Sequence, residues 1–346
     1  MNTVLYLVIP CYNEEEVLHE TARQLKEKIE IMISKGTISN QSRIMFVNDG
    51  SKDKTWSIIK ELHNKDSLFS GLNLSRNRGH QNALLAGLMT AKDLSDVTIS
   101  LDADLQDDIH VIDRFIEKYH DGYDVVYGVR SSRAKDTWFK RNTALAFYRF
   151  QEKMGVNSVY NHADYRLMSK RALEALSQFK EVNLFLRGLV PLVGFDSCIV
   201  EYERNERFAG ESKYPLKKML SFAWDGITSF SIKPIRFVTL IGIIIFVVSI
   251  LVTFYCIIRK LMGDTVDGWT FLSCSIWVLG GIQLLSIGIV GEYIGKIYSE
   301  TKARPRYIIK EILDEKPYSM YKRLLIKHFS YLISSLFIVK DMMYMM

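Results

Sequence analysis

Short apolar runs alternate with longer amphipathic stretches over the first two hundred residues. Each run is followed by about 15 to 30 residues whose apolar positions recur at helical spacing. The alternation predicts an α/β fold on a mainly parallel sheet, with strands at residues 4–9, 43–47, 71–74, 97–101 and 123–127. Open sheets of this kind bind ligands at the carboxyl ends of their strands, so we expect functional side chains directly after these runs.

Two later segments are apolar over a much greater length. Residues 237–258 and 268–291 are 22 and 24 residues without a charge, and each is long enough as a helix to cross a bilayer. Soluble helices of this length usually carry a polar face, so two core helices of a soluble protein are the weaker interpretation. The pattern predicts two transmembrane helices.

The charges around these segments predict their orientation. The connection at residues 259–267 carries two positive and two negative charges, whereas the outer ends are flanked by basic residues. These are Lys233, Arg236, Lys296, Lys302, Arg304 and Arg306. By the positive-inside rule both outer ends face the cytoplasm. Since the N-terminus lacks the basic region of a signal peptide, we expect a multi-pass protein of the cell membrane whose large N-terminal domain is cytoplasmic.

The same patterns divide the chain into four parts. These are an α/β domain at 1–213, an amphipathic interfacial segment at 214–234, two transmembrane helices within 235–294 and a cytosolic or interfacial tail at 295–346. Leu216, Leu220 and Trp224 recur at helical spacing, which is typical of an interfacial helix, although an ordinary half-buried helix has the same pattern. Gly291 and Gly295 suit close helix packing, which leaves a homo-oligomer formed through these helices open.

Composition excludes several classes of protein. The formal net charge of +6 suits an anionic membrane surface or phosphate ligands but is too small to indicate a nucleic-acid partner. The four cysteines have no zinc-site spacing. The chain also lacks the glycine-rich fingerprints of dinucleotide-binding and P-loop proteins.

Two aspartates follow the fourth predicted strand. If the segment stays extended, Asp102 and Asp104 point to the same side, where two carboxylates can share a divalent cation with diphosphate oxygens. A D-x-D sequence alone is more often a solvated turn. Its place after an apolar strand favours a site for Mg²⁺ or Mn²⁺.

Polar residues also follow the first three strands. Tyr12 offers a ring on which a base could stack, and Asp49 could accept hydrogen bonds from a base or ribose. The alternative is local, because Asn13 and Ser51 are residue types that cap helices. His80 lies at the predicted start of the helix after the third strand, where a diphosphate could approach, although a lone histidine is more often structural.

Taken together and in this order, the motifs resemble a known family. Pro10-Cys-Tyr-Asn-Glu-Glu, Asn48-Asp-Gly-Ser-Lys-Asp and Asp102-Ala-Asp-Leu-Gln are similar to motifs of the family 2 inverting glycosyltransferases with the GT-A fold. The segments 75–88, 163–167 and 207–214, followed by two spans, resemble its polyprenyl-phosphate glycosyltransferases, a group related to dolichol-phosphate-mannose synthase. The resemblance covers residues 4–310.

The resemblance implies roles for individual residues. The nucleotide sugar would be bound by Pro10, Tyr12, Glu14, Asp49, Asp102, Ala103, Asp104 and Gln106, with Asp102 and Asp104 also holding the metal ion. Asp104 and Asp164 would be the catalytic carboxylates, and the acceptor phosphate would meet Arg130, Arg207 and Lys213. The Gln-x-x-Arg-Trp signature of the processive branch is absent, which favours transfer of one sugar per turnover.

The chemistry of a phosphate acceptor changes what the enzyme must supply. A phosphate monoester, with a second pKa of about 6, is already ionised at neutral pH and needs no general base. We therefore expect Asp164 to orient or tune the site. The sequence predicts transfer of a hexose or N-acetylhexosamine from a nucleotide sugar, with UDP-glucose or UDP-GlcNAc favoured, to undecaprenyl phosphate. The alternatives are GDP-mannose with dolichyl phosphate and a noncatalytic membrane scaffold.

Overall fold

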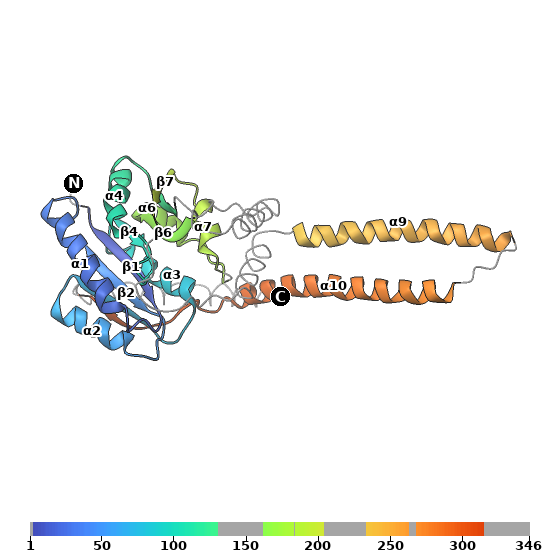
Figure 1. Ribbon diagram of the computed structural model, residues 1–346, viewed down its shortest axis with the longest axis horizontal. Coiled ribbons are helices and arrows are strands. Elements are labelled where there is room, and N and C mark those ends of the chain that lie inside the picture. Colours follow the sequence, from blue (N-terminus) through green and yellow to red (C-terminus); the bar gives the residue numbers. More distant parts are fainter. Residues whose placement is uncertain (1–2, 131–161, 183, 204–232, 263–267, 315–346) are drawn as a thin grey trace, which may run out of the picture.

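The computed structural model describes residues 3–130, 162–182, 184–203, 233–262 and 268–314. An α/β body carries a projecting hairpin of two long helices (Figure 1). Arg207, Lys213, most of the predicted interfacial segment and the chain after residue 314 lie outside the described residues.

The body is built on one eight-stranded sheet with the order β7-β5-β6-β4-β1-β2-β3-β8. Its strands are β1 Leu5–Cys11, β2 Arg43–Asn48, β3 Phe69–Leu74, β4 Val97–Ser100, β5 Val125–Arg130, β6 His162–Ser169, β7 Ser197–Tyr202 and β8 Ile309–Leu313. Strands β4, β1, β2 and β3 are parallel, as are β5 and β7, whereas β6 and β8 run antiparallel to their neighbours. The five predicted strands are confirmed as β1 to β5, and the sheet is mixed, with its parallel part at the centre.

Helices cover both faces of this sheet. They are α1 Leu18–Ser34, α2 Thr55–Lys65, α3 His80–Ala91, α4 Ile112–His120, α6 Lys170–Leu176 and α7 Leu186–Leu192. Helices α1, α2 and α4 pack on one face with Leu5, Leu7 and Ile9, whereas α3, α6 and α7 pack on the other with Tyr6 and Val8. Strand β1 is therefore buried on both sides, which explains its uninterrupted apolar sequence.

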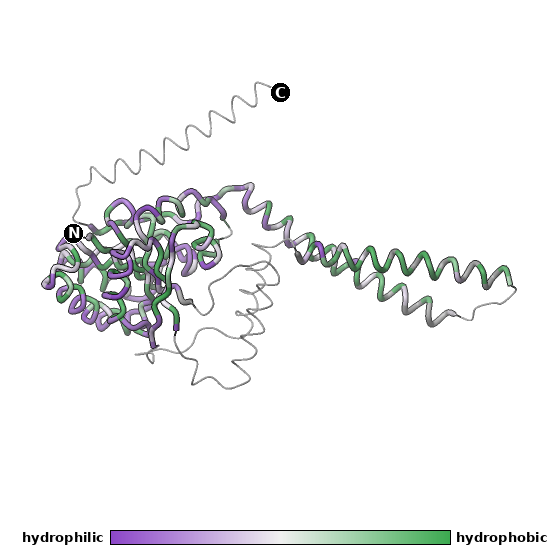
Figure 2. Tube along the Cα trace, turned by 90° about the horizontal axis from the view of Figure 1, so that it is seen from above, coloured by the Kyte–Doolittle hydropathy of each residue, from purple (hydrophilic) through white to green (hydrophobic). Residues whose placement is uncertain are grey.

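The hairpin consists of α9 Lys233–Leu261 and α10 Trp269–Lys302. Both are long and apolar enough to cross a membrane, and among the described side chains of residues 235–252 and 278–302 none is buried within the protein. Figure 2 shows hydrophobic residues along most of both helices and hydrophilic residues where the hairpin meets the α/β body. The described apolar side chains of these two ranges therefore lie outside the core of the α/β body.

The chain after α10 returns to the body. Strand β8 adds to the edge of the sheet beside β3, with Leu72 paired to Ile312 and the Ser75 amide donating to the Ile308 carbonyl at 2.9 Å. The hydropathy pattern did not predict this strand, because it is short and its apolar residues differ little from those of a tail. Part of the segment predicted as a C-terminal tail thus belongs to the sheet.

Two loops at the carboxyl edge are tied together by side chains. The Asn13 amide donates to Ser51 Oγ at 3.0 Å, and Asn13 Oδ1 accepts from the Lys52 amide at 2.9 Å. The expectation that Asn13 and Ser51 cap helices is wrong, since α1 and α2 begin after Val17 and Lys54, neither of which makes a side-chain cap. These polar groups instead bond across the gap between adjacent loops, which sequence spacing cannot show.

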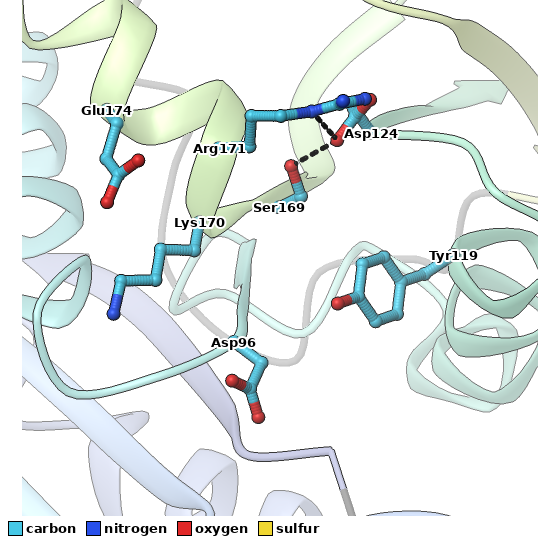
Figure 3. A pocket seen from close by; sticks show the side chains of 7 residues that line it. All are labelled: Asp96, Tyr119, Asp124, Ser169, Lys170, Arg171 and Glu174. Carbon is cyan, nitrogen blue, oxygen red and sulfur yellow. Dashed lines mark hydrogen bonds and ion pairs between the residues drawn. The ribbon is translucent and has the colours of Figure 1, made fainter. Parts of the chain in front are cut away.

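A polar hollow of about 380 Å³ lies at the other end of the strands, beside the residues that precede β4 and β5 (Figure 3). Asp124, just before β5, accepts from Ser169 Oγ at 2.7 Å and pairs with Arg171. Burial alone would raise the pKa of Asp124, but these partners lower it below its ordinary value. The hollow lies at the edge where the parallel strands begin, away from the edge at which such sheets bind ligands.

Gly50 is expected to be intolerant of a side chain. It has φ +63°, and a Cβ there would lie 2.5 Å from the backbone of Arg76 and Asn77, so the loops after β2 and β3 would have to separate. Gly36 is the matched control, because its φ is +71° but nothing lies within 4 Å of its Cβ position. Gly36→Ala should cost about 1–2 kcal/mol. Gly50→Ala should lower the melting temperature in detergent further, and equal losses would contradict the close approach.

The pairing of Asp124 gives a pH-dependent expectation. A carboxyl whose pKa is lower in the folded state stabilises the protein above its unfolded pKa of about 3.9, and the contribution is lost as pH falls through the folded value. Asp124→Asn should therefore lower the melting temperature at pH 7, and the difference should shrink below about pH 4. The control Glu174→Gln removes an exposed carboxyl from the same hollow and should leave the melting curve unchanged.

Candidate active site

Antiparallel pairing of β6 with β4 brings the candidate catalytic carboxylates together. Ser100, the last residue of β4, pairs with Arg166, and its Oγ donates to the Asp164 carbonyl at 2.5 Å. The start of β6 therefore lies beside the end of β4, where Asp102 and Asp104 follow. The structure thus places Asp164 next to the D-x-D segment, although 60 positions separate Asp164 from Asp104 in the sequence.

His80 lies between two of these carboxylates. Its Nε2 is 3.7 Å from Asp102 Oδ1 and 3.6 Å from Asp164 Oδ2. Burial alone would lower the pKa of His80, but Asp164 and Asp102 together raise it to about 9, so the ring is an imidazolium at neutral pH. About a third of the His80 side chain (34%) and 39% of the Asp102 side chain remain exposed, so both can meet a ligand.

Asp164 is surrounded by positive charge. Oδ1 accepts from Arg166 Nη2 at 2.5 Å and from Arg187 Nε at 3.3 Å, while Oδ2 accepts from Arg187 Nη2 at 3.2 Å. Burial alone would raise the pKa of Asp164, but these guanidinium groups and His80 hold it well below its ordinary value. Asp164 is therefore ionised at neutral pH and is a weak proton acceptor. Its orienting role stays a prediction.

Arg166 and Arg187 were not among the predicted site residues. Arg166 is two positions after Asp164 on strand β6, so the two side chains share a face. The two-residue period of a strand could therefore have identified Arg166 from the sequence. Arg187 is on α7, and no motif or spacing in the sequence connects it to Asp164. Arg166 is 1% exposed, and its Nε and Nη1 atoms have no hydrogen-bond partner among the described residues.

The D-x-D segment is a turn, which corrects the expectation of an extended strand. Strand β4 ends at Ser100, the backbone turns at residues 103–104, and the Gln106 amide donates to Asp104 Oδ1 at 3.2 Å. Ala103 is buried and its carbonyl accepts from Thr21 Oγ1 at 2.7 Å. Leu105 has φ +56°, in the left-handed region that few residues other than glycine adopt, and strained residues of this kind cluster at functional sites.

The D-x-D turn gathers negative charge that a divalent cation shared with a substrate would neutralise. Among the described residues no group of three or more His, Cys, Asp or Glu side chains is arranged to hold a metal ion. Burial raises the pKa of Asp102, and so do Asp164 and Asp104, so a cation would relieve crowded negative charge there. Two carboxylates supply hard oxygen ligands, and diphosphate oxygens would complete the coordination.

A second cluster of polar side chains, Asp107, Tyr202 and Arg130, follows the D-x-D turn. Asp107 is 3% exposed and accepts from Tyr202 OH at 2.5 Å, and Arg130 Nη2 is 3.9 Å from the same oxygen. Burial and the nearby Asp102 raise the pKa of Asp107 to about 6. Arg130, predicted to contact an acceptor phosphate, is thus held at the end of β5 near the D-x-D turn.

The predicted nucleotide residues lie at the ends of β1 and β2. Tyr12 is 38% exposed, as stacking on a base requires, and Pro10 is buried within β1. Asp49 is 2% exposed, and its two oxygens accept from the amides of Arg78 at 2.7 Å and Gly79 at 2.9 Å. The structure therefore shows Asp49 holding the loop that precedes His80, and its contact with a base or ribose stays a prediction.

Comparisons with known proteins identify the family. The family model described as glycosyl transferase family 2 matches residues 6–177. The chain is 57% identical over 306 residues to the uncharacterized glycosyltransferase YkoT of Bacillus subtilis (strain 168), covering 88% of this chain and 91% of that protein. It is 43% identical to the bactoprenol glucosyl transferase of Shigella phage SfV, covering 88% and 97%.

A solved structure resembles the chain more distantly. The mannosyltransferase PcManGT from Pyrobaculum calidifontis, in complex with GDP-Man and Mn²⁺, has a TM-score of 0.44 and 12% identity, covering 86% of this chain and 85% of that one. The assignment rests on the sequence relatives, which are similar over nearly their whole length. The chain belongs to glycosyl transferase family 2, as its motifs predicted.

Proposed function

We propose that this protein transfers one glucosyl group from a nucleotide sugar, UDP-glucose in the first instance, to a polyprenyl phosphate at the cytoplasmic face of the membrane, with inversion of the anomeric centre. The observation that carries the proposal is a cluster of aspartates and basic side chains at the carboxyl ends of the strands. The same chain also has two apolar helices long enough to cross a membrane. The relatives named bactoprenol glucosyl transferase, at 42% and 43% identity, support the sugar and the lipid.

On the donor side, Asp102 and Asp104 would hold Mg²⁺ or Mn²⁺ together with the diphosphate. The bound cation would neutralise the charge that develops on the diphosphate as the nucleotide leaves. Tyr12 would stack on the base, with Glu14 near the ribose and Gln106 on the sugar side. His80, an imidazolium beside Asp102, would add positive charge close to the leaving group.

On the acceptor side, the phosphate arrives already ionised, so the protein needs to clamp and aim it. Asp164 would hold Arg187 and His80 in fixed positions, and 40% of the Arg187 side chain is exposed, so a phosphate could contact it. Arg130 would be a further phosphate contact. Arg207 and Lys213 stay proposals for the same role, since they lie outside the described residues.

The hairpin would deliver the lipid to this site. Helices α9 and α10 run antiparallel, so the start of α9 and the end of α10 are both at the end of the hairpin that faces the α/β body (Figure 1). If both cross the bilayer, the positive-inside rule puts these ends and the body on the cytoplasmic side. A prenyl chain could then stay in the bilayer while its phosphate reaches the sheet edge.

A substrate panel tests the proposal. Purified protein in detergent is incubated with radiolabelled UDP-glucose, UDP-GlcNAc or GDP-mannose, with or without undecaprenyl phosphate, and the label is extracted into organic solvent. We expect extraction only with the lipid and most from UDP-glucose, and loss of the signal with EDTA. If the lipid is labelled from another donor, the proposed sugar is wrong and that donor takes its place. If no donor gives transfer, the proposal that the protein is an enzyme is overturned.

The low pKa of Asp164 predicts an order among the aspartate variants. Removing a true general base costs about 10²–10⁴-fold in rate, whereas an orienting carboxylate should cost less. We expect kcat at saturating acceptor to fall by less than about hundredfold for Asp164→Asn, and to fall further for Asp104→Asn. Because buried Arg166 loses its counterion in Asp164→Asn, rates are compared per folded protein from melting curves. Equal losses would make Asp164 a base.

A further inference from the structure

The end of α10 and the residues after it contact both loops that carry the partners of Asp164. We call residues 300–314 the strap. It runs from the last turn of the second long helix, along the loops at the sheet edge, and into strand β8. Nothing in the proposed chemistry requires this route, since a membrane helix could end in a free tail.

The first contact is with the loop between β3 and α3. Arg78 Nη2 donates to the Pro305 carbonyl at 2.5 Å, while the backbone of Arg78 and Gly79 is held from the other side by Asp49. Gly79 has φ +86° and precedes His80, the first residue of α3. The strap and Asp49 therefore hold the two residues whose backbone sets the position of His80.

The second contact is with the segment that leads into α7. Arg306 Nη2 donates to the Phe179 carbonyl at 2.6 Å, and Glu300 Oε2 accepts from the Val182 amide at 2.8 Å. The same segment is tied to α3, since the Leu186 amide donates to Gln81 Oε1 at 2.9 Å. Arg187, which pairs with Asp164, is the residue after Leu186.

The strap is itself anchored to the sheet. Strand β8 is hydrogen-bonded to β3. Glu311 pairs with Lys60 at 3.1 Å and accepts from Trp56 Nε1 at 3.2 Å. A segment fixed at this end and continuous with a long helix at the other can hold loops in place between them.

We propose that the strap positions His80 and Arg187 around Asp164, with Arg306 as a positioning residue, so that the second long helix and the reaction centre form one mechanical unit. The proposal deepens the proposed function, on which its kinetic test rests. Through the strap, the depth at which α10 sits in the bilayer would set the height of the site above the lipid phosphate. A strap that only covers a sheet edge would leave the geometry of the site unaffected.

The kinetic test compares two arginines of the strap. Arg304 is exposed and makes no hydrogen bond or ion pair with the residues that the structure describes, so Arg304→Ala is the control for Arg306→Ala. Because small misplacements of catalytic groups cost up to about hundredfold in rate, we expect kcat to fall about 10- to 100-fold in Arg306→Ala only, with KM for the nucleotide sugar little changed. Arg306→Lys, whose ammonium group can still donate to the Phe179 carbonyl, should recover part of the loss.

A double variant tests whether the effect acts through Arg187. If Arg306 positions Arg187, the loss in Arg306→Ala combined with Arg187→Ala should be smaller than the product of the two single losses. Losses that multiply would mean that Arg306 acts elsewhere and would overturn the positioning role.

Hydrogen exchange gives a readout that does not need activity. Amides of residues 75–82 and 179–187 should exchange faster in Arg306→Ala than in Arg304→Ala, while the core of β1 stays protected. If the wild type transfers no sugar, the proposed function fails and this exchange still tests the strap. Unchanged exchange, or equal activity in Arg306→Ala and Arg304→Ala, would overturn the inference.

A second site keeps the test available if Arg306→Ala does not fold. Glu300→Ala removes the acceptor of the Val182 amide, whereas Glu300→Gln keeps an oxygen that can accept this bond. Faster exchange at 179–187 in the alanine variant alone supports the strap. Equal exchange in both variants contradicts it.

Discussion

The ionised carboxylate of Asp164 is the constraint on which the candidate site depends. A buried charge is tolerated only when it is paired, and Asp164 gathers its partners from three elements. Arg166 comes from β6, His80 from α3 and Arg187 from α7. The same pairing holds the partly exposed side chains of His80 and Arg187 near Asp102. Under the proposed function, these cations would meet the diphosphate or the lipid phosphate.

This arrangement also separates two roles that carboxylates often share. Asp164 is saturated with cations, and its pKa lies well below the ordinary value. Burial and the neighbouring carboxylates Asp164 and Asp104 raise the pKa of Asp102. The first is suited to fixing geometry, the second to receiving a cation, and an acceptor that is already ionised requires neither to remove a proton.

Rigid connections between loops support this geometry. Asn13 and Ser51 join the loops after β1 and β2, Gly50 lets the loop after β3 approach, and Asp49 bonds to that loop. On the far side the residues after α10 meet the same loop through Arg78. Because these loops are connected to one another, they can hold side chains that follow different strands in fixed relative positions. Unconnected loops hold functional groups less precisely.

The sequence by itself determined the parts that depend on local pattern. Apolar runs located β1 to β5, hydropathy located the two long helices, and the D-x-D segment with the neighbouring loop motifs identified the family. These features are legible because period and composition are properties of adjacent residues. His80 was placed at the start of a helix for the same reason.

Only the tertiary structure decided which distant residues meet. The antiparallel insertion of β6 beside β4 brings Asp164 to the D-x-D turn, and the packing of α7 brings Arg187 to Asp164. The return of β8 to the sheet was hidden as well, because its register depends on the open edge of β3. Strand order and loop contacts arise from packing between elements, and residue spacing within one element carries no record of them.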